Sequence, residues 1–537
     1  MTARGASASS AVPLPSLSTR IRFTSPAAAS VVIALVAILA FIGAPWNGYA
    51  MDDLEILANP LLHSAGTLPA TLGTPWWWTV GALYRPLTLF TLGVDQLLGG
   101  SAAWLPHAIN VVLHAIVAAL VTRLYARFLP LAAAFAAGLL FAVLPAHVEA
   151  VASVVGRAEL LSALAMVTLM LVVTGDAPPG RWTRLLAVVL SAAALASKEG
   201  GVVAPALALA AAWSRPAQRR HALQWAGWAL VGTAALLLAR LAVLGTLGGD
   251  LSHPAFRIAS GGSRLMIALS MLPRAAVELV LPQPPTIDYA PALETVRHPD
   301  MRLAAAGVLL VVLAVMALVR HVRRPSAATL GMCVAAAAMA PTSNIFFASG
   351  VVLAARTLYA PSIGTGMLIG SAIAWCMGTR ARGVLPYAVG ALIVLGLVVT
   401  WREVPVWRST DAVLTAMGDR QPDNYRVPTY RAYAARDAGR TPEAVRYFRA
   451  AAERFPADWE MLTNGATVAL RMHDTTTAAA WLQAAIDAYP GAARARVRLV
   501  MILRARGDSA GATRLLLEGL RADPDQRQWA HMLRDTT

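Results

Sequence analysis

Long apolar stretches separated by short polar loops dominate the first 400 positions of the chain. Many of them approach the roughly 17–22 residues that an α-helix needs to cross a bilayer. We expect eleven transmembrane helices near residues 29–45, 105–124, 131–147, 158–174, 183–198, 201–214, 222–244, 301–319, 327–345, 358–377 and 384–400. The pattern predicts an all-α, polytopic membrane bundle over 29–403, with long outer loops at 46–104 and 245–300.

One further apolar stretch, 264–282, is interrupted by Pro273, Arg274 and Glu278. A proline and two charges are costly in the middle of a membrane-spanning helix. We therefore expect this helix to lie at the membrane interface or to pack inside the bundle.

The polar segment that begins near residue 408 repeats with a period of 34 residues. Its recurring positions are Pro422, Pro456, Pro490 and Pro524, then Ala444, Ala478 and Ala512, and then Phe448, Leu482 and Leu516. Small residues where paired helices cross, and proline after the second helix, are typical of tetratricopeptide repeats. The sequence predicts an α-solenoid over 404–537, in which the half-repeat 408–424 caps the array against the last span.

Composition agrees with a membrane protein. The chain is 57% hydrophobic and only 14% charged, whereas soluble proteins average about 25% charged residues. The net charge of +16 does not indicate a nucleic-acid partner, because the arginines cluster in short loops between apolar stretches. Cys333 and Cys376 lie in apolar segments, so no disulfide or metal motif is readable.

The arginines also predict an orientation. The tail 1–28 carries Arg4, Arg20 and Arg22 without an acidic residue, which places it in the cytoplasm. We expect the first apolar stretch to be retained as a span, since no small-residue cleavage site follows it. Alternation then puts the arginine-rich loops in the cytoplasm and the repeat array outside. Those loops contain Arg123, Arg127, Arg181, Arg184, Arg215, Arg219, Arg220, Arg320, Arg323, Arg324, Arg380 and Arg382.

With this orientation, unusual polar residues gather on the outer side. They are Asp52, Asp53, Arg85, His147, Glu149, Arg157, Glu159, Lys198, Glu199, Asp288, Arg356 and Tyr359. Charge at membrane depth is costly and usually functional. Each residue alone also has a structural explanation, such as a helix cap for the Asp pair, an ion pair between Arg157 and Glu159, or an interfacial hydrogen bond for His147.

Lys198 is the only lysine among 45 basic residues. A chain that otherwise uses arginine suggests that a compact point charge is needed at this position, where a planar guanidinium does not serve. Chance retention of one lysine is the alternative.

Several segments together carry a resemblance to a known family: YAMDDLEILANP, YRPLTL, LPAHVEAVASVVGRAELLS, SKEG, PTIDY and ARTLYAPSIG, followed by the 34-residue repeats. They resemble the transmembrane-and-tetratricopeptide O-mannosyltransferases (TMTC), including bacterial relatives. The resemblance implies a GT-C glycosyltransferase fold and a polyprenyl-phosphate sugar donor used on the outer face. It also implies an acidic catalytic motif in the first outer loop, which Asp52 and Asp53 match.

The expected reaction moves a mannose-like sugar to a protein Ser/Thr hydroxyl with inversion. Adjacent carboxylates on a helix diverge by about 100°, so one acts as the base, and the resemblance assigns that role to Asp52. Arg85, Arg157, Lys198 and Arg356 are the candidates for the phosphate. His147 and Glu149 would orient the base or, with Asp52, hold Mg²⁺ or Mn²⁺, an option that the sequence leaves open.

The sequence also leaves two other functions open. The same enzyme class could act on an envelope lipid or polysaccharide, or the chain could be a membrane scaffold whose repeats recruit a protein partner. For each of these we expect a bacterial inner-membrane protein with a periplasmic repeat array, surrounded by membrane lipid.

Overall fold

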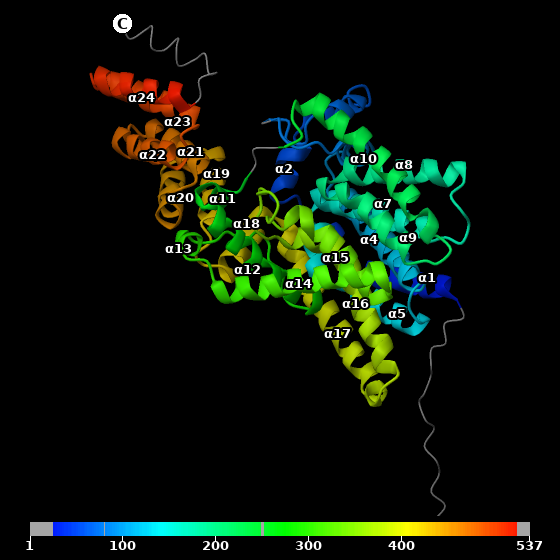
Figure 1. Cartoon of the computed structure of the whole chain (residues 1–537). Coiled ribbons are helices and arrows are strands. Elements are labelled where there is room, and N and C mark those ends of the chain that lie inside the picture. The colour runs from blue at the N-terminus through cyan, green and yellow to red at the C-terminus, as the bar shows by residue number, and fades with distance from the viewer. Residues whose placement is uncertain (1–24, 80, 249–251, 523–537) are drawn as a thin grey trace, which may run out of the picture.

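The computed structural model describes residues 25–79, 81–248 and 252–522. Over these residues the chain forms helices joined by loops, with two isolated β-bridges, Trp77–Ala82 and Tyr289–Leu353. A bundle of long helices carries a curved array of shorter helix pairs on one side (Figure 1). The predictions that concern the tail up to residue 24, with its three arginines, and Pro524 lie outside the described residues.

The predicted all-α fold is confirmed. The bundle consists of α1 (Pro26–Ala40), α2 (Asp52–Leu57), α3 (Pro86–Gly99), α4 (Trp104–Tyr125), α5 (Leu131–Ala142), α6 (Val148–Ala152), α7 (Arg157–Val173), α8 (Arg181–Ser197), α9 (Ala204–Trp213), α10 (Ala222–Leu244), α11 (Pro254–Ile258), α12 (Gly261–Val280), α13 (Leu293–Arg297), α14 (Met301–Arg323), α15 (Ala327–Met339), α16 (Tyr359–Met377) and α17 (Leu385–Glu403). The array consists of α18 (Thr410–Arg420), α19 (Arg426–Asp437), α20 (Thr441–Arg454), α21 (Trp459–Arg471), α22 (Thr475–Ala488), α23 (Ala493–Ala505) and α24 (Ser509–Ala522).

Seven helices of the described chain are long and apolar enough to cross a membrane, as expected of a multi-pass membrane protein. The count rises to eight if the pair Leu131–Ala142 and Pro145–Ala152, which is bent by 50°, forms one span. The helices Glu199–Trp213 and Ala327–Thr342 are apolar but shorter. The predicted number of eleven is therefore not confirmed, because several of the expected stretches form helices too short for this criterion.

Small residues allow neighbouring helices of the bundle to approach closely. Gly364 on α16 faces α15, and a Cβ atom at this position would lie 2.2 Å from the amide nitrogen of Ala335. Only glycine fits such a contact. Close packing through small residues is typical of helices in a membrane, where burial of apolar surface provides little drive for association.

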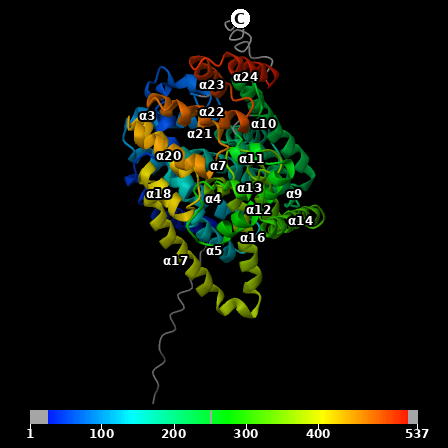
Figure 2. The same cartoon turned by 90° about the vertical axis from the view of Figure 1, so that its left-hand side faces the viewer.

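The repeat array has the predicted arrangement. Helix pairs α19/α20, α21/α22 and α23/α24 follow each other with the 34-residue period, and the recurring small and large apolar positions are fully buried: Ala444, Ala478, Ala512, Phe448, Leu482 and Leu516. Figure 2 shows the pairs stacked in order along the array. The half-repeat helix α18 packs into the core of the bundle through Val413, Leu414 and Met417.

Helix α12, which covers the interrupted stretch, supports the array. Its residues Ile267, Met271 and Leu279 share an apolar cluster with Tyr425 and Phe455 of the first repeat. The helix is not among the seven apolar enough to cross a membrane. Because α12 shares this cluster with the first repeat, it joins the bundle to the array.

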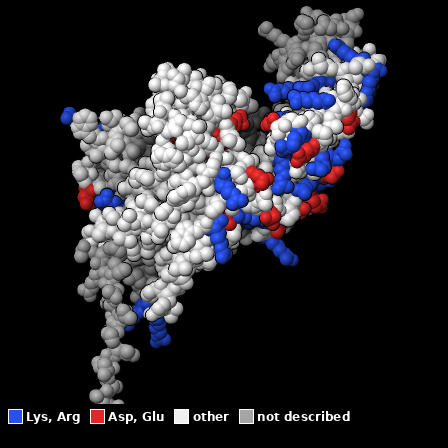
Figure 3. Space-filling view, turned by 180° about the vertical axis from the view of Figure 1, so that it is seen from behind, with Lys and Arg blue, Asp and Glu red and all other residues white. Residues whose placement is uncertain are grey.

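Charged side chains gather on the array, whereas the visible surface of the bundle is largely uncharged (Figure 3). This division is what a lipid-facing bundle and a solvent-facing array require.

Candidate active site

A strained residue precedes the Asp pair. Met51 has φ +53° and ψ −123°, a conformation that L-residues rarely adopt and that costs about 1–3 kcal/mol. The hydroxyl of Thr410, at the start of α18, accepts a hydrogen bond from the Met51 backbone N–H at 2.9 Å. The junction with the array therefore fixes the backbone from which α2 and its two carboxylates begin.

The two carboxylates diverge, as their adjacency predicts. Asp53 is fully buried and accepts hydrogen bonds from Ala50 N at 3.2 Å, Ser153 Oγ at 3.1 Å and Val155 N at 2.9 Å. Burial raises the pKa of Asp53 from 3.8 to about 6, although these hydrogen bonds oppose the shift. Asp52 is partly exposed and has no hydrogen-bond or ion-pair partner among the described residues. Asp53 thus anchors α2, whereas Asp52 forms no such contact among the described residues.

Three of the predicted cations form ion pairs with three of the predicted acids. Arg85 binds Glu199 through Nε and Nη2 at 3.0 and 2.8 Å, and Arg240 approaches the same carboxylate at 3.8 Å. The Lys198 ammonium lies 2.5 Å from Glu159. Each pair joins segments far apart in the chain, so the pairs hold these ends of the bundle helices together.

The third pair links Arg356 to Glu149. Arg356 Nη1 lies 2.6 Å from Glu149 Oε1, and the Arg356 backbone N–H donates to Oε2 of the same carboxylate at 3.0 Å. The charge of Asp52 also acts on Arg356, and the charges of Arg85 and Arg356 act on Lys198. Asp52, Arg85, Lys198 and Arg356 thus lie within range of one another's charges, and their membership of one site stays a prediction.

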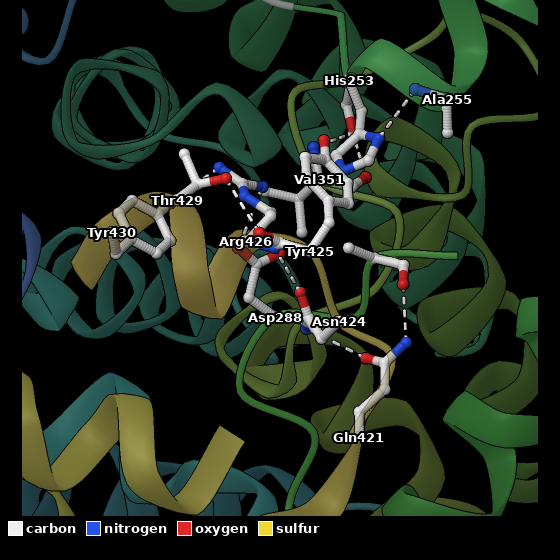
Figure 4. A network of polar contacts seen from close by, with 12 residues as sticks. His253, Ala255, Asp288, Val351, Gln421, Asn424, Tyr425, Arg426, Thr429 and Tyr430 are labelled. Carbon is white, nitrogen blue, oxygen red and sulfur yellow. Dashed lines mark hydrogen bonds and ion pairs between the residues drawn. The ribbon is translucent and has the colours of Figure 1, made fainter. Parts of the chain in front are cut away.

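Asp288, the predicted acid of the second outer loop, faces the array. Its Oδ2 lies 2.9 Å from Arg426 Nη1 of α19, and its backbone carbonyl accepts from Asn424 Nδ2 at 2.8 Å (Figure 4). The sequence did not single out Arg426, nor Tyr430, whose hydroxyl Arg426 also binds at 2.7 Å. Both occupy ordinary positions of the first repeat helix, so no sequence signal marks them.

Arg157 lies inside the packing. It is 1% exposed, pairs with Asp95 of α3 at 2.5 Å, and donates to Asn110 Oδ1 and the Pro106 carbonyl, both at 2.9 Å. This network fixes α3 and α7 against α4. Because its partners enclose it, we leave Arg157 out of the phosphate-binding set proposed below.

His147 and Tyr359 are fully buried as well. His147 Nε2 lies 2.8 Å from Ser362 Oγ, and the Tyr359 hydroxyl lies 2.8 Å from Nδ1 of His114, with the rings of the three residues in contact. Their roles in binding a ligand stay predictions, and their contacts join α4, α16 and the turn before α6.

The residues suggested for a metal ion do not converge. His147 is bound to Ser362, and Glu149 is bound to Arg356, so neither turns to Asp52. Across the described residues no group of three or more His, Cys, Asp or Glu side chains is placed to hold a metal ion. We therefore derive no step through a metal.

Loops that carry the clustered arginines meet one another. Arg215 pairs with Asp176 at 2.7 Å, and Arg127 donates to the Thr174 hydroxyl at 2.5 Å. Trp213 donates to a backbone carbonyl of α14 at 3.1 Å. The loops that follow α4, α7, α9 and α14 thus lie together, and the side of the membrane on which they lie stays a prediction.

Comparisons with known proteins agree with this architecture. Tetratricopeptide repeat models match residues 429–493 and 469–535. The chain is 28% identical to the mouse protein O-mannosyl-transferase TMTC3 over 373 residues, which are 60% of this chain and 40% of the relative. It is 26% identical to human TMTC1 over 512 residues, 83% of this chain and 57% of the relative. A shorter match of 166 residues, 29% of this chain and 19% of the relative, is 35% identical to Tmtc1 of Drosophila melanogaster.

The chain therefore spans about half or less of the length of these relatives. The resemblance to the TMTC family that the motifs indicate is confirmed.

Proposed function

We propose that the chain is a membrane glycosyltransferase that moves a mannose-like sugar from a polyprenyl-phosphate carrier to a Ser or Thr hydroxyl of a protein. One observation carries the proposal. An unpaired, partly exposed carboxylate, Asp52, lies within range of the charge of Arg356, in a chain related to proteins named protein O-mannosyl-transferases.

Asp52 is the general base of the proposed reaction. Its carboxylate takes the proton of the acceptor hydroxyl while the hydroxyl oxygen forms a bond to the anomeric carbon of the sugar. The bond between that carbon and the phosphate oxygen breaks at the same time, which inverts the anomeric centre. Asp53 stays bound to Ser153 and Val155 and keeps α2 in place.

The three paired cations stabilise the leaving phosphate. Preorganised charge in a water-poor site is the largest source of stabilisation for a developing anion. Arg85 engages Glu199 through Nε and Nη2, which leaves Nη1 for a ligand, and Arg356 engages Glu149 through Nη1, which leaves its other guanidinium donors. Lys198 supplies a point charge.

The site faces the extracytoplasmic side in this proposal. The loops with clustered arginines meet at another part of the bundle, and the positive-inside rule assigns them to the cytoplasm. The array then lies in the periplasm of a bacterium, on the side from which a secreted acceptor approaches.

The test uses the full chain in lipid nanodiscs with polyprenyl-phosphate mannose and Ser/Thr-containing peptides. We expect mannosylated peptide from this donor and none from GDP-mannose. Asp52→Asn lowers the transfer rate by about 10²–10⁴, whereas the matched change Glu55→Gln on the same helix, at an exposed residue, leaves it unchanged. Transfer to lipid or glycan alone contradicts the proposed acceptor, and a chain that uses neither donor contradicts the enzyme class.

A further inference from the structure

The first repeat helix reaches the charged site of the bundle. The guanidinium of Arg426 lies between Asp288, at 2.9 Å, and the Tyr430 hydroxyl, at 2.7 Å (Figure 4). The Arg426 and Asp288 side chains are 24% and 10% exposed. A partly desolvated ion pair of this kind holds its members in one geometry.

Asp288 also lies next to the segment that carries Arg356. The backbone of Tyr289 donates to Leu353 at 2.9 Å, and Ala355 donates to Thr286 at 2.7 Å. Residues 286–289 therefore pair with the residues directly before Arg356. A short path of contacts runs from the proposed phosphate site through Asp288 and Arg426 to Tyr430.

Tyr430 presents a hydroxyl proton that the protein does not use. Its oxygen accepts from Arg426, and its O–H has no acceptor among the described residues. Burial is the main cause that raises the pKa of Tyr430 to about 12. The charge of Arg426 lowers this pKa, and the charges of Asp288 and Asp52 raise it. The phenol therefore keeps its proton at neutral pH. Tyr430 and Met51, which precedes Asp52, pack against the same apolar core.

A cavity also lies between the 245–300 loop and the later repeats, and Tyr430 and Asp288 are not among its lining residues. The cavity measures about 550 Å³ and is lined by Ile258, Ser260 and Val296 of the loop and by Pro456, Ala484 and Asp487 of the repeats. Ligand pockets measure roughly 300–1,000 Å³. In the proposed function the donor's phosphate binds the cations, and its polyprenyl chain lies in the membrane. A ligand that binds on the side of the array is therefore the acceptor.

We propose that the repeat array completes the site: the Tyr430 hydroxyl binds the acceptor polypeptide by donating to one of its backbone carbonyls, while Asp52 receives the proton of its Ser or Thr hydroxyl. Arg426 is the positioning residue that holds the Tyr430 oxygen and turns its proton toward the acceptor. This inference rests on the proposed function and assigns the acceptor side of the same site.

The test compares two tyrosines on one helix. Tyr430→Phe keeps the ring and its packing and removes only the hydroxyl. Tyr433→Phe is the matched control, because the Tyr433 hydroxyl is bound only by Asn464, at 3.4 Å, among the described residues. Arg426→Lys keeps a charge for Asp288 and loses the planar fork that also reaches Tyr430.

Peptide KM, kcat, donor KM and the slow transfer of mannose to water are measured for the full chain in nanodiscs with polyprenyl-phosphate mannose and a Ser/Thr peptide. We expect Tyr430→Phe to raise the peptide KM about 3- to 10-fold, as for loss of one neutral hydrogen bond. In Tyr430→Phe the donor KM and the transfer to water stay at the wild-type values. Arg426→Lys also raises the peptide KM. Tyr433→Phe leaves all four quantities at the wild-type values.

A wild-type peptide KM for Tyr430→Phe overturns the inference. An equal loss of peptide transfer and water transfer also overturns it, because that pattern belongs to a structural role. If Tyr430→Phe does not fold, Arg426→Lys decides by the same criteria. Full activity of Asp52→Asn, or a wild type that mannosylates no peptide, overturns the proposed function itself. Loss of activity in Asp52→Asn beside an unchanged Tyr430→Phe rejects the inference alone.

Discussion

The buried carboxylate of Asp53 makes the opening of α2 depend on pH. Asp53 is fully buried and binds the Val155 N–H at 2.9 Å, so exchange of that amide proton requires the contact to break. Its pKa is about 6 in the folded chain and 3.8 when exposed. As the pH rises, Asp53 in the opened state loses its proton before Asp53 in the closed, folded state does. The closed state therefore becomes less stable between about pH 3.8 and about pH 6.

The size of this effect follows from the two pKa values. One pKa unit corresponds to about 1.4 kcal/mol, so the full penalty above pH 6 is about 3 kcal/mol. Acidification from about pH 7.5 to about pH 5 recovers nearly half of it, about 1.4 kcal/mol, which is about a tenfold change in the opening equilibrium. Below pH 3.8 both states are protonated, and the group adds no further change.

Hydrogen exchange of the segment around Val155, corrected for the intrinsic pH dependence of exchange, measures this equilibrium. We expect about tenfold stronger protection at pH 5 than at pH 7.5 in the wild type and in the control Asp52→Asn. Asp53→Asn removes the titrating group, so its protection does not respond to pH in this range. A wild-type pH response in Asp53→Asn refutes the assignment of the effect to this carboxylate.

Three further predictions concern other parts of the chain. Lys198→Ala raises the donor KM about tenfold or more, because it removes one charge-assisted contact to phosphate; an unchanged donor KM in a transfer assay contradicts the role of Lys198. Arg157→Met leaves Asp95 buried without its partner and lowers stability by about 3–5 kcal/mol, whereas Arg157→Met with Asp95→Leu restores most of it. Thermal unfolding in detergent compares the two, and a double variant as unstable as the single one contradicts the reasoning. Reporter tags in the 175–181 loop and after the C-terminus lie on opposite sides of the membrane, and labelling of both from one side refutes the orientation.

Hydrophobic pattern predicted where the helices lie better than which of them cross. Each of the eleven stretches contains a helix, because apolar composition over many residues decides local structure directly. The stretch 131–147 bends by 50° between Ala142 and Pro145, where proline cannot continue the helix. Such breaks depend on a single residue, and a hydropathy average over the stretch does not detect them.

The sequence predicted that these charges share one side of the membrane, which stays a prediction, and it did not predict which residues pair with one another. Glu149 and Arg356 are 207 residues apart, and Arg85 and Glu199 are 114 apart. Pairing over such distances is decided by how the helices pack. Arg157 was predicted to bind phosphate or to pair with Glu159, but its partner is Asp95. Asp95 lies in α3, a helix that the hydrophobic pattern did not mark.

The sequence pattern did not indicate that residues of the array contribute to the site. The 34-residue period identifies which repeat positions are buried, and it treats the others as surface. Arg426 and Tyr430 are such positions, and only the docking of α19 on residues 286–289 brings them to Asp288. A repeat residue gains a site-specific role from the surface it meets, which the repeat itself does not encode.

The role of Asp52 as the base in transfer from a polyprenyl-phosphate sugar is open to a direct kinetic measurement. Single-turnover transfer from polyprenyl-phosphate mannose to a Ser/Thr peptide, measured beside donor binding for the wild type and Asp52→Asn, tests it most directly. For Asp52→Asn we expect unchanged donor affinity and a transfer rate lower by about 10²–10⁴. An Asp52→Asn chain that folds, binds the donor and transfers at the wild-type rate contradicts it.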